Sequence, residues 1–360
     1  MTSLTDTPMS VPAPTRKQGA GRAVRWGRLV WRELTTVAIT IFGLLLVTFF
    51  IARVIPIDPV LAVVGDNARP DVYENARIAL GLDKPLWQQF AAYVGKVFTG
   101  DLGRSVLTSN TVVDDIKRVF PATLELATLG TLIGVLVGVP LGIVAAVNQG
   151  RWPDQFARIV GLIGYSIPVF WLGLMGLLLF YAKLGWVSGP GRIGIAYQDF
   201  VDPITNIIML DAALQGEWDA FRNAFSHLIL PASVLGLLSV AYISRMTRSF
   251  MITELQQQYV IAARVKGLSE WRVIWRHALR NAAVPLVTVI ALSYMHLLEG
   301  SVLTETIFAW PGLGRYITNS LLNADMNAVL GGTLVVGAVF IAVNLFTDIL
   351  ARIADPRARC

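Results

Sequence analysis

The stretch QYVIAARVKGLSEWRVIWRHALRNAAVP, residues 258–285, decides how the rest of the chain is interpreted. It is polar and strongly basic, and it separates two long apolar runs, 228–242 and 283–298, that have the composition of membrane spans. Gly267 follows a run of good helix formers, at a place where a left-handed C-terminal cap is expected. Ser269 can then cap a second helix. The stretch predicts a helix–glycine–helix element at a membrane surface.

The two expected helices differ in the side chains that they present. Ala262 and Ala263 precede the glycine, and small side chains directed outward allow a partner to approach closely. On the second helix Trp271 and Trp275 share an apolar face at helical spacing, which is also typical of an anchor in the membrane interface. A stripe of arginines four residues apart follows another face, where lipid phosphates are the alternative partner: Arg272, Arg276 and Arg280.

The spacing Ala-Ala-x-x-x-Gly resembles the loop through which the permeases of ABC transporters dock into their ATPase subunits. The longer string YVIAARVKGLSEWRVIWRHALRNAAVP is similar to the dipeptide/oligopeptide/nickel branch of those permeases. Ile261 stands where the general motif has glutamate, and Arg280 where it has a closing proline; the peptide branch commonly lacks both. Family-like strings, among them LGLDKPLWQQF, GDLGRS and SIPVFW, extend the resemblance over roughly residues 35–357.

The resemblance implies an all-α membrane protein with six transmembrane helices, a type I ABC importer permease fold and an extracytoplasmic cap after the first helix. It implies a second homologous permease as partner, two cytosolic ATPase domains that bind ATP and Mg, and an extracytoplasmic solute-binding protein. No cofactor is expected in this chain. The residues that would couple it to the ATPase are Tyr259, Ala262, Ala263, Arg264, Lys266, Gly267 and Leu268.

Composition independently favours a membrane protein. Hydrophobic residues make up 54% of the 360 residues and charged residues only 15%, which is too apolar for a soluble chain of this length. The net charge of +6 would suit nucleic acid or an anionic membrane. Because the basic residues lie beside the apolar runs, we expect membrane lipids as partners and no nucleic acid.

The apolar runs divide the chain into parts. A disordered basic tail is expected over 1–32, a transmembrane domain over 33–355, and a short terminus over 356–360. Between the spans, 56–118 is expected to cap the bundle outside the membrane, and 252–280, called the basic insert below, to carry the coupling loop. Glycines four apart in the second run predict close helix packing. The expected spans are 34–55, 122–147, 156–181, 227–251, 281–303 and 328–349.

Six spans place both termini on one side of the membrane. Lys and Arg are concentrated in the N-terminal tail, in the basic insert and after the last span. By the positive-inside rule these segments are cytoplasmic. We therefore expect a multi-pass protein of the bacterial inner membrane with its N- and C-termini, and the basic insert, in the cytoplasm.

The sequence carries no recognisable catalytic constellation. His227, His277 and His296 are scattered over different runs without accompanying cysteines, so no metal site is expected. A phosphate-binding GxxxxGK[ST] motif is absent from the sequence, so ATP hydrolysis is assigned to partner subunits. Glu125 and Glu299 are embedded acids and candidates for the substrate path, although an interfacial carboxylate is an equal alternative for Glu299.

These features predict a non-catalytic transmembrane subunit of an ATP-driven, solute-binding-protein-dependent importer. The resemblance implies di- or oligopeptides as substrates, with a nickel complex, an opine or a sugar as alternatives. The other class considered is an autonomous secondary transporter. That class would require several embedded ionisable groups, which the sequence does not display.

Overall fold

The computed structural model describes residues 19–54, 59–65 and 67–354. In these ranges the regular structure is helical, and the only β pairing is an isolated bridge between Arg104 and Thr111. The all-α fold class predicted from the sequence is confirmed. By length and composition, five uninterrupted helical stretches in the described part are able to cross a membrane, and one bent helix pair adds a sixth.

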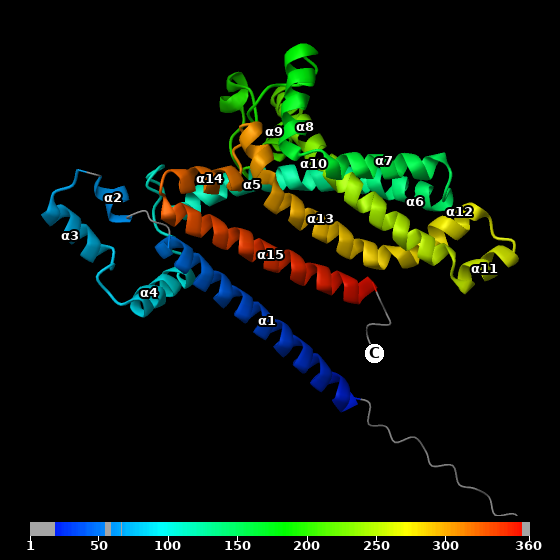
Figure 1. The fold of residues 1–360 in the computed structure, drawn as a ribbon, viewed down its shortest axis with the longest axis horizontal. Coiled ribbons are helices and arrows are strands. Elements are labelled where there is room, and N and C mark those ends of the chain that lie inside the picture. Colours follow the sequence, from blue (N-terminus) through cyan, green and yellow to red (C-terminus); the bar gives the residue numbers. More distant parts are fainter. Residues whose placement is uncertain (1–18, 55–58, 66, 355–360) are drawn as a thin grey trace, which may run out of the picture.

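The long helices run side by side along one direction (Figure 1). Helix α10 lies at the centre and packs against α5, α6, α7 and α13, while α1 packs against α15. The second span is continuous from α5 through a π-helical segment, η1, into α6. The bounds of these helices are α1 Gly19–Val54, α5 Val112–Ile133, η1 Gly134–Gly138, α6 Val139–Val147, α7 Trp152–Ser166, α10 Trp218–Leu255, α13 Leu279–Ile307 and α15 Met326–Ala354.

Glycines let the second span approach α10 to backbone contact. A Cβ atom on Gly134 would lie 2.0 Å from the Ser239 hydroxyl oxygen. One on Gly142 would lie 2.6 Å from the carbonyl oxygen of Ser244. No side chain fits at such distances, so the spacing of four residues seen in the sequence serves helix packing.

The third span is broken rather than straight. Helix α7 is followed by α8, Val169–Gly176, and η2, Leu177–Lys183, and the two halves are bent by 98°. Ile167 before Pro168 is extended, with ψ 124°, because proline disfavours helical backbone in the residue that precedes it. The expected span 156–181 falls within this bent pair, in which α8 stands steeply away from α7 (Figure 1).

Short helices close the end of the bundle opposite the basic insert. The segment after α1 forms a cap whose ring contacts include Phe49 with Phe90, at a centroid distance of 5.3 Å. The Ser105 hydroxyl donates a 2.5 Å hydrogen bond to the buried carboxylate of Asp325, which ties the cap to the start of α15. The short helices here are α2 Pro59–Val64, α3 Pro70–Ala79, α4 Leu86–Phe98, η3 Ile195–Phe200, α9 Ile208–Gln215 and α14 Leu313–Leu322.

Several helices extend beyond the expected spans. Residues 19–32 of the expected disordered tail are helical, because α1 begins at Gly19 and no proline interrupts it; residues 1–18 and 356–360 lie outside the described part. Helix α10 begins at 218 instead of 227, and α5 begins inside the expected cap. The N-terminal end of α1 and the C-terminal end of α15 both point to the side of the molecule that holds the basic insert (Figure 1).

Candidate functional site

The basic insert has the predicted helix–glycine–helix form. Helix α11, Gln258–Val265, ends in a turn at Gly267, where φ is +78°. The amide of Leu268 donates to the carbonyl of Ala263, and the amide of Gly267 donates to the carbonyl of Arg264. These two hydrogen bonds are those of a Schellman motif, in which glycine ends a helix. Helix α12, Glu270–Arg272, and the π-helical η4, Val273–Ala278, then lead into α13. A left-handed backbone at Gly267 is what reverses the chain here.

One face of α11 packs against the helical bundle. Val260 and Ala263 share one face at a spacing of three residues, and they pack with Met251 of α10 and Val273 of η4. Ala263 is only 6% exposed. The expectation that Ala263 is directed outward for a partner is therefore wrong, because its helical phase turns it toward this chain's own core. Ala262, its neighbour, is exposed as expected.

Other positions of α11 carry apolar side chains that this chain leaves exposed. Val265 is 83% exposed, Ile261 is 52% exposed and Tyr259 is 37% exposed. On the second arm Trp271 and Trp275 are also exposed, with ring centroids 5.0 Å apart. We call these five side chains the exposed face of the insert. Aliphatic side chains so exposed on a fixed helix are typical of a protein-docking surface.

Polar contacts hold the two arms of the insert together. The Arg264 guanidinium donates to both carboxylate oxygens of Glu270, at 2.9 and 3.2 Å, across the glycine turn. Ser269 occupies the N-cap position of α12, but its hydroxyl makes no capping hydrogen bond, contrary to expectation. The Tyr259 hydroxyl donates to Glu254 at 2.5 Å, and burial raises the pKa of this phenol above its usual value. The phenol therefore remains a donor at neutral pH.

The insert also presents a strongly basic surface. Lys266 is exposed beside the turn, and the arginine stripe expected from the sequence is exposed along η4 and its flanks. Salt bridges in the described residues do not involve the stripe, whose members are Arg272, Arg276 and Arg280. Unpaired arginines suit contact with anionic partners, either acidic protein side chains or lipid phosphates.

A buried carboxylate links the start of α7 to α10. Asp154, in the first turn of α7, is fully buried and receives hydrogen bonds from Arg248 of α10 at 2.6 and 2.9 Å. Arg158 and the amide of Gly150 donate to the same carboxylate. This network fixes the start of α7 to the part of α10 that carries the insert, so movement of one is transmitted to the other. No pattern in the sequence singles out Asp154.

Glu125 is a paired structural residue. Its carboxylate is buried, and Arg192 donates to it at 2.6 and 3.0 Å from the loop before η3. The amide of Met209, at the start of α9, also donates to it. These contacts clamp the long loop onto α5, and they occupy the carboxylate, so Glu125 does not line an open path in this structure.

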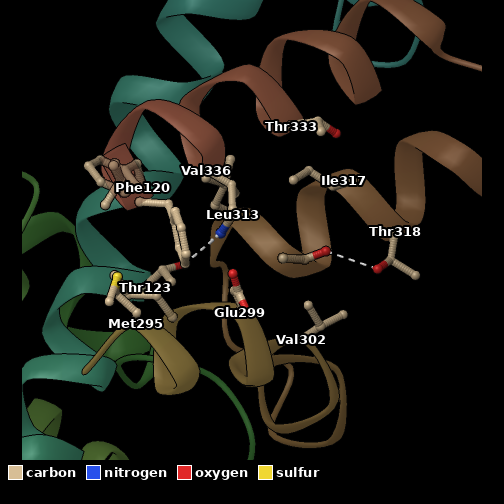
Figure 2. A pocket seen from close by; sticks show the side chains of 14 residues that line it. Phe120, Thr123, Met295, Glu299, Val302, Leu313, Ile317, Thr318, Thr333 and Val336 are labelled. Carbon is tan, nitrogen blue, oxygen red and sulfur yellow. Dashed lines mark hydrogen bonds between the residues drawn. The ribbon is translucent and has the colours of Figure 1, made fainter. Parts of the chain in front are cut away.

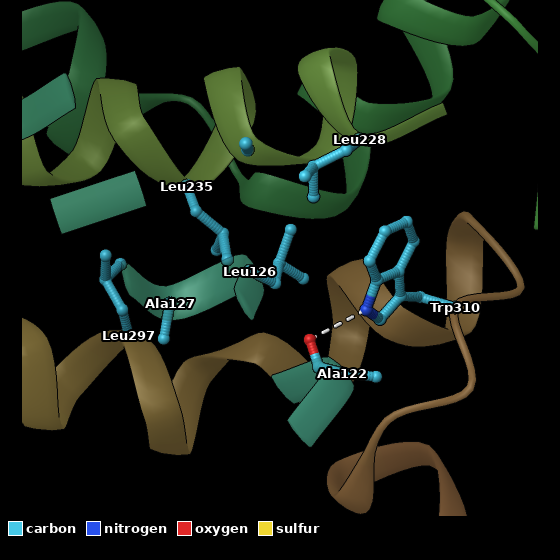
Figure 3. Close-up of a cluster of buried hydrophobic side chains, with 8 residues drawn as sticks. Ala122, Leu126, Ala127, Leu228, Leu235, Leu297 and Trp310 are labelled. Atoms are coloured by element: carbon cyan, nitrogen blue, oxygen red, sulfur yellow. Dashed lines mark hydrogen bonds between the residues drawn. The ribbon is translucent and has the colours of Figure 1, made fainter. Parts of the chain in front are cut away.

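Glu305 is a buried acid that the sequence reasoning did not single out. Its carboxylate accepts hydrogen bonds from the Thr123 hydroxyl at 2.7 Å and from the Arg315 amide in the first turn of α14 at 2.8 Å. Next to it, Trp310 is buried and its indole nitrogen donates to the carbonyl of Ala122 at 2.9 Å (Figure 3). These bonds hold the turn after α13 against α5. The dipole of α14 favours the negative charge.

Glu299 lies apart from these networks. It lines a pocket of about 230 Å³ between α5, α13, α14 and α15, together with Met295 and Val302 of the same helix (Figure 2). Its side chain is exposed, and no described residue forms a hydrogen bond or ion pair with its carboxylate. Of the two acids expected on the substrate path, Glu299 lines this pocket and Glu125 does not.

Five or six helical stretches able to cross a membrane in the described part of the chain, with a basic insert between two of them, are the architecture of a multi-span membrane protein. Residues 138–359 match the family described as binding-protein-dependent transport system inner membrane component, and residues 27–127 match the N-terminal part of such components. The chain belongs to this family, and it is a multi-pass inner-membrane protein. The family predicted from the sequence is confirmed.

Curated relatives match about nine tenths of the chain. A probable D,D-dipeptide transport system permease protein of Escherichia coli K12 is 42% identical, covering 89% of this chain and 94% of that protein. A di/tripeptide transport system permease protein of Pseudomonas aeruginosa is 43% identical, covering 91% and 97%. A solved inward-facing MetNI methionine ABC transporter is similar with a TM-score of 0.48 and 16% identity, over 65% of this chain and 93% of that one.

Proposed function

We propose that the chain is one of two transmembrane subunits of an ATP-driven importer of di- or oligopeptides. Support for the substrate class comes from relatives above 40% identity that are named as dipeptide and di/tripeptide permeases. A nickel complex, an opine or a sugar is the alternative cargo. The observation that carries the coupling role is the exposed face of the insert on a helix whose other side is anchored in the bundle.

The insert converts ATPase movement into movement of the spans. In this proposal Tyr259, Ala262 and the exposed aliphatic side chains of α11 contact a cytosolic ATPase subunit, and Lys266 meets its acidic residues. Leu268 and Gly267 keep the turn in place. Because α11 packs on Met251 and Val273, a displacement of the insert moves α10 and α13 together. Two ATPase positions then select two arrangements of the bundle.

The partners follow from this role. A second homologous permease completes the pathway as a heterodimer, two ATPase domains bind ATP and Mg, and a solute-binding protein delivers the peptide. This chain is non-catalytic and holds no cofactor. We place both termini in the cytoplasm, because the N-terminal end of α1 and the C-terminal end of α15 point to the side of the insert (Figure 1). The arginine stripe lies at the cytoplasmic lipid surface.

Reconstitution tests the proposal. Proteoliposomes that contain the chain, its second permease, the ATPase subunits and the solute-binding protein should accumulate radiolabelled leucyl-alanine when ATP is supplied on the ATPase side. Liposomes with the chain alone should accumulate none. ATP-independent uptake by the chain alone, driven by an ion gradient, would instead indicate a secondary transporter.

A further inference from the structure

The pocket at Glu299 combines an apolar lining with a single acid. Its wall includes Phe120 of α5, Met295 and Leu298 of α13, Ile317 of α14, and Phe340 of α15. No arginine, lysine or histidine lines it in the described part of the chain. An apolar cavity of about 150 Å³ is able to hold benzene. A volume of about 230 Å³ is therefore enough for one aliphatic or aromatic side chain, but small for a whole drug-sized ligand.

The pocket keeps its shape because buried polar groups fix its floor. Thr123 lies between Glu305 and the amide of Leu313, with hydrogen bonds of 2.7 Å to each. At Gly314 a Cβ atom would lie 2.6 Å from Val302, so the start of α14 is seated tightly on α13. The Thr123 hydroxyl, the Glu305 carboxylate and the Leu313 amide are thus paired within the protein. The Glu299 carboxylate, which Figure 2 shows between the floor residues and Val302, is the charged group of the lining, and no described residue pairs with it.

An unpaired carboxylate in an apolar pocket favours a cation as its partner. Glu299 lies 20 residues into α13, about 30 Å from its start at 1.5 Å per residue, and its neighbours in the pocket wall, Leu298 and Val302, are apolar. An ionised group in such surroundings is costly unless it is paired or hydrated. His296 is one turn away on the same helix, and it makes no hydrogen bond to Glu299.

We propose that this pocket is a subsite for the amino-terminal residue of the transported peptide. Glu299 pairs with the free α-ammonium group, and the apolar wall takes the first side chain. The inference rests on the proposed function, because it assumes that peptides pass this chain. It goes further by assigning one charge contact and one side-chain pocket, and it excludes a carboxylate-binding role for the site.

Uptake by the complete reconstituted importer tests the charge contact. Glu299→Gln keeps the size of the side chain and removes its charge, so uptake of leucyl-alanine should fall about tenfold or more, which corresponds to about 1.4 kcal/mol. Glu299→Asp should recover part of the loss. Stimulation of ATP hydrolysis by the loaded solute-binding protein should stay within about twofold, since α11 is untouched. Asp219→Asn, an exposed acid at the start of α10, is the matched control and should transport normally.

Labelling of the pocket tests its occupant directly. In a complex with Cys360→Ser, Val302→Cys would place the chain's single thiol in the pocket wall. Leucyl-alanine should slow its reaction with N-ethylmaleimide, N-acetyl-leucyl-alanine should not, and Glu299→Gln should abolish the protection.

Three results would overturn the subsite. The first is normal peptide uptake by Glu299→Gln. The second is a Val302→Cys thiol that does not react with N-ethylmaleimide whether or not peptide is present, as would happen if the second permease covered the pocket. The third is a thiol that reacts at the same rate with and without peptide, as would happen if lipid filled the pocket. If wild-type importer moves no peptide at all, the proposed function fails instead.

Discussion

Replacing Val265 with aspartate should remove the ATPase subunit without disturbing the membrane domain. Val265 is 83% exposed on α11, so an ATPase that covers it buries most of a valine side chain. Full burial of valine is worth about 1.5–3 kcal/mol, so this contact contributes about 2 kcal/mol. An aspartate would lose that contribution and leave an unpaired carboxylate at the interface, which costs about 1–3 kcal/mol more.

The sum, about 3–5 kcal/mol, corresponds to a loss of affinity of at least about a hundredfold. The measurement is a titration of purified ATPase subunit onto the permease pair in detergent, with thermal unfolding of the permease as the check on folding. Val72→Asp, on α3 in the cap at the far end, is the matched control and should bind normally. Binding of Val265→Asp within about threefold of wild type would refute the reasoning.

Three further predictions concern the bundle and its orientation. Gly134→Leu should yield no folded protein in size-exclusion profiles, because no side chain fits beside Ser239. Gly300→Leu, which has open space around it, is the control and should fold. A normal yield of Gly134→Leu would contradict the packing. Asp154→Asn should lower the free energy of unfolding by about 3 kcal/mol, because Arg248 loses its partner, and an unchanged melting temperature would argue against that role. A membrane-impermeant maleimide should label Cys360 only in inside-out vesicles, and labelling of right-side-out vesicles would reverse the topology.

The turn of the insert was predictable because it is determined locally. Gly267 follows a helical pattern, and positive φ is accessible to glycine at little cost, so the residue itself marks the end of α11. The direction of Ala263 was not predictable in the same way. It depends on which face of α11 meets Met251 and Val273, and those contacts come from two other helices. Val265, the most exposed aliphatic side chain of the insert, was missed for the same reason.

The buried acids show a similar division. An embedded carboxylate is costly unless it is paired or hydrated, and the sequence left both open for Glu125. Its partner, Arg192, lies 67 residues away in a loop without regular pattern. The only feature of the sequence that relates to the role of Glu305 is its position before the Trp-Pro-Gly turn. After that turn α14 begins, and Glu305 accepts a hydrogen bond from an amide in the first turn of that helix. Its burial is a property of the folded turn after α13.

The bend in the third span could not be predicted from composition. Residues 156–181 are apolar enough to cross a membrane, and hydropathy counts them without regard to direction. Pro168 was visible in the sequence, but a proline permits either a modest kink or a full break. Packing of α8 against the end of α13 accompanies a bend of 98° here.

The central claim is that the exposed face of the insert contacts the ATPase. Photo-crosslinking from single positions tests it most directly, with p-benzoylphenylalanine placed at Ile261 or at Val72 in the assembled complex. The account predicts a crosslink to the ATPase subunit from position 261, strengthened or weakened by nucleotide, and none from position 72. Crosslinks from position 261 to lipid or to the second permease alone, with no ATPase adduct under any nucleotide condition, would contradict it.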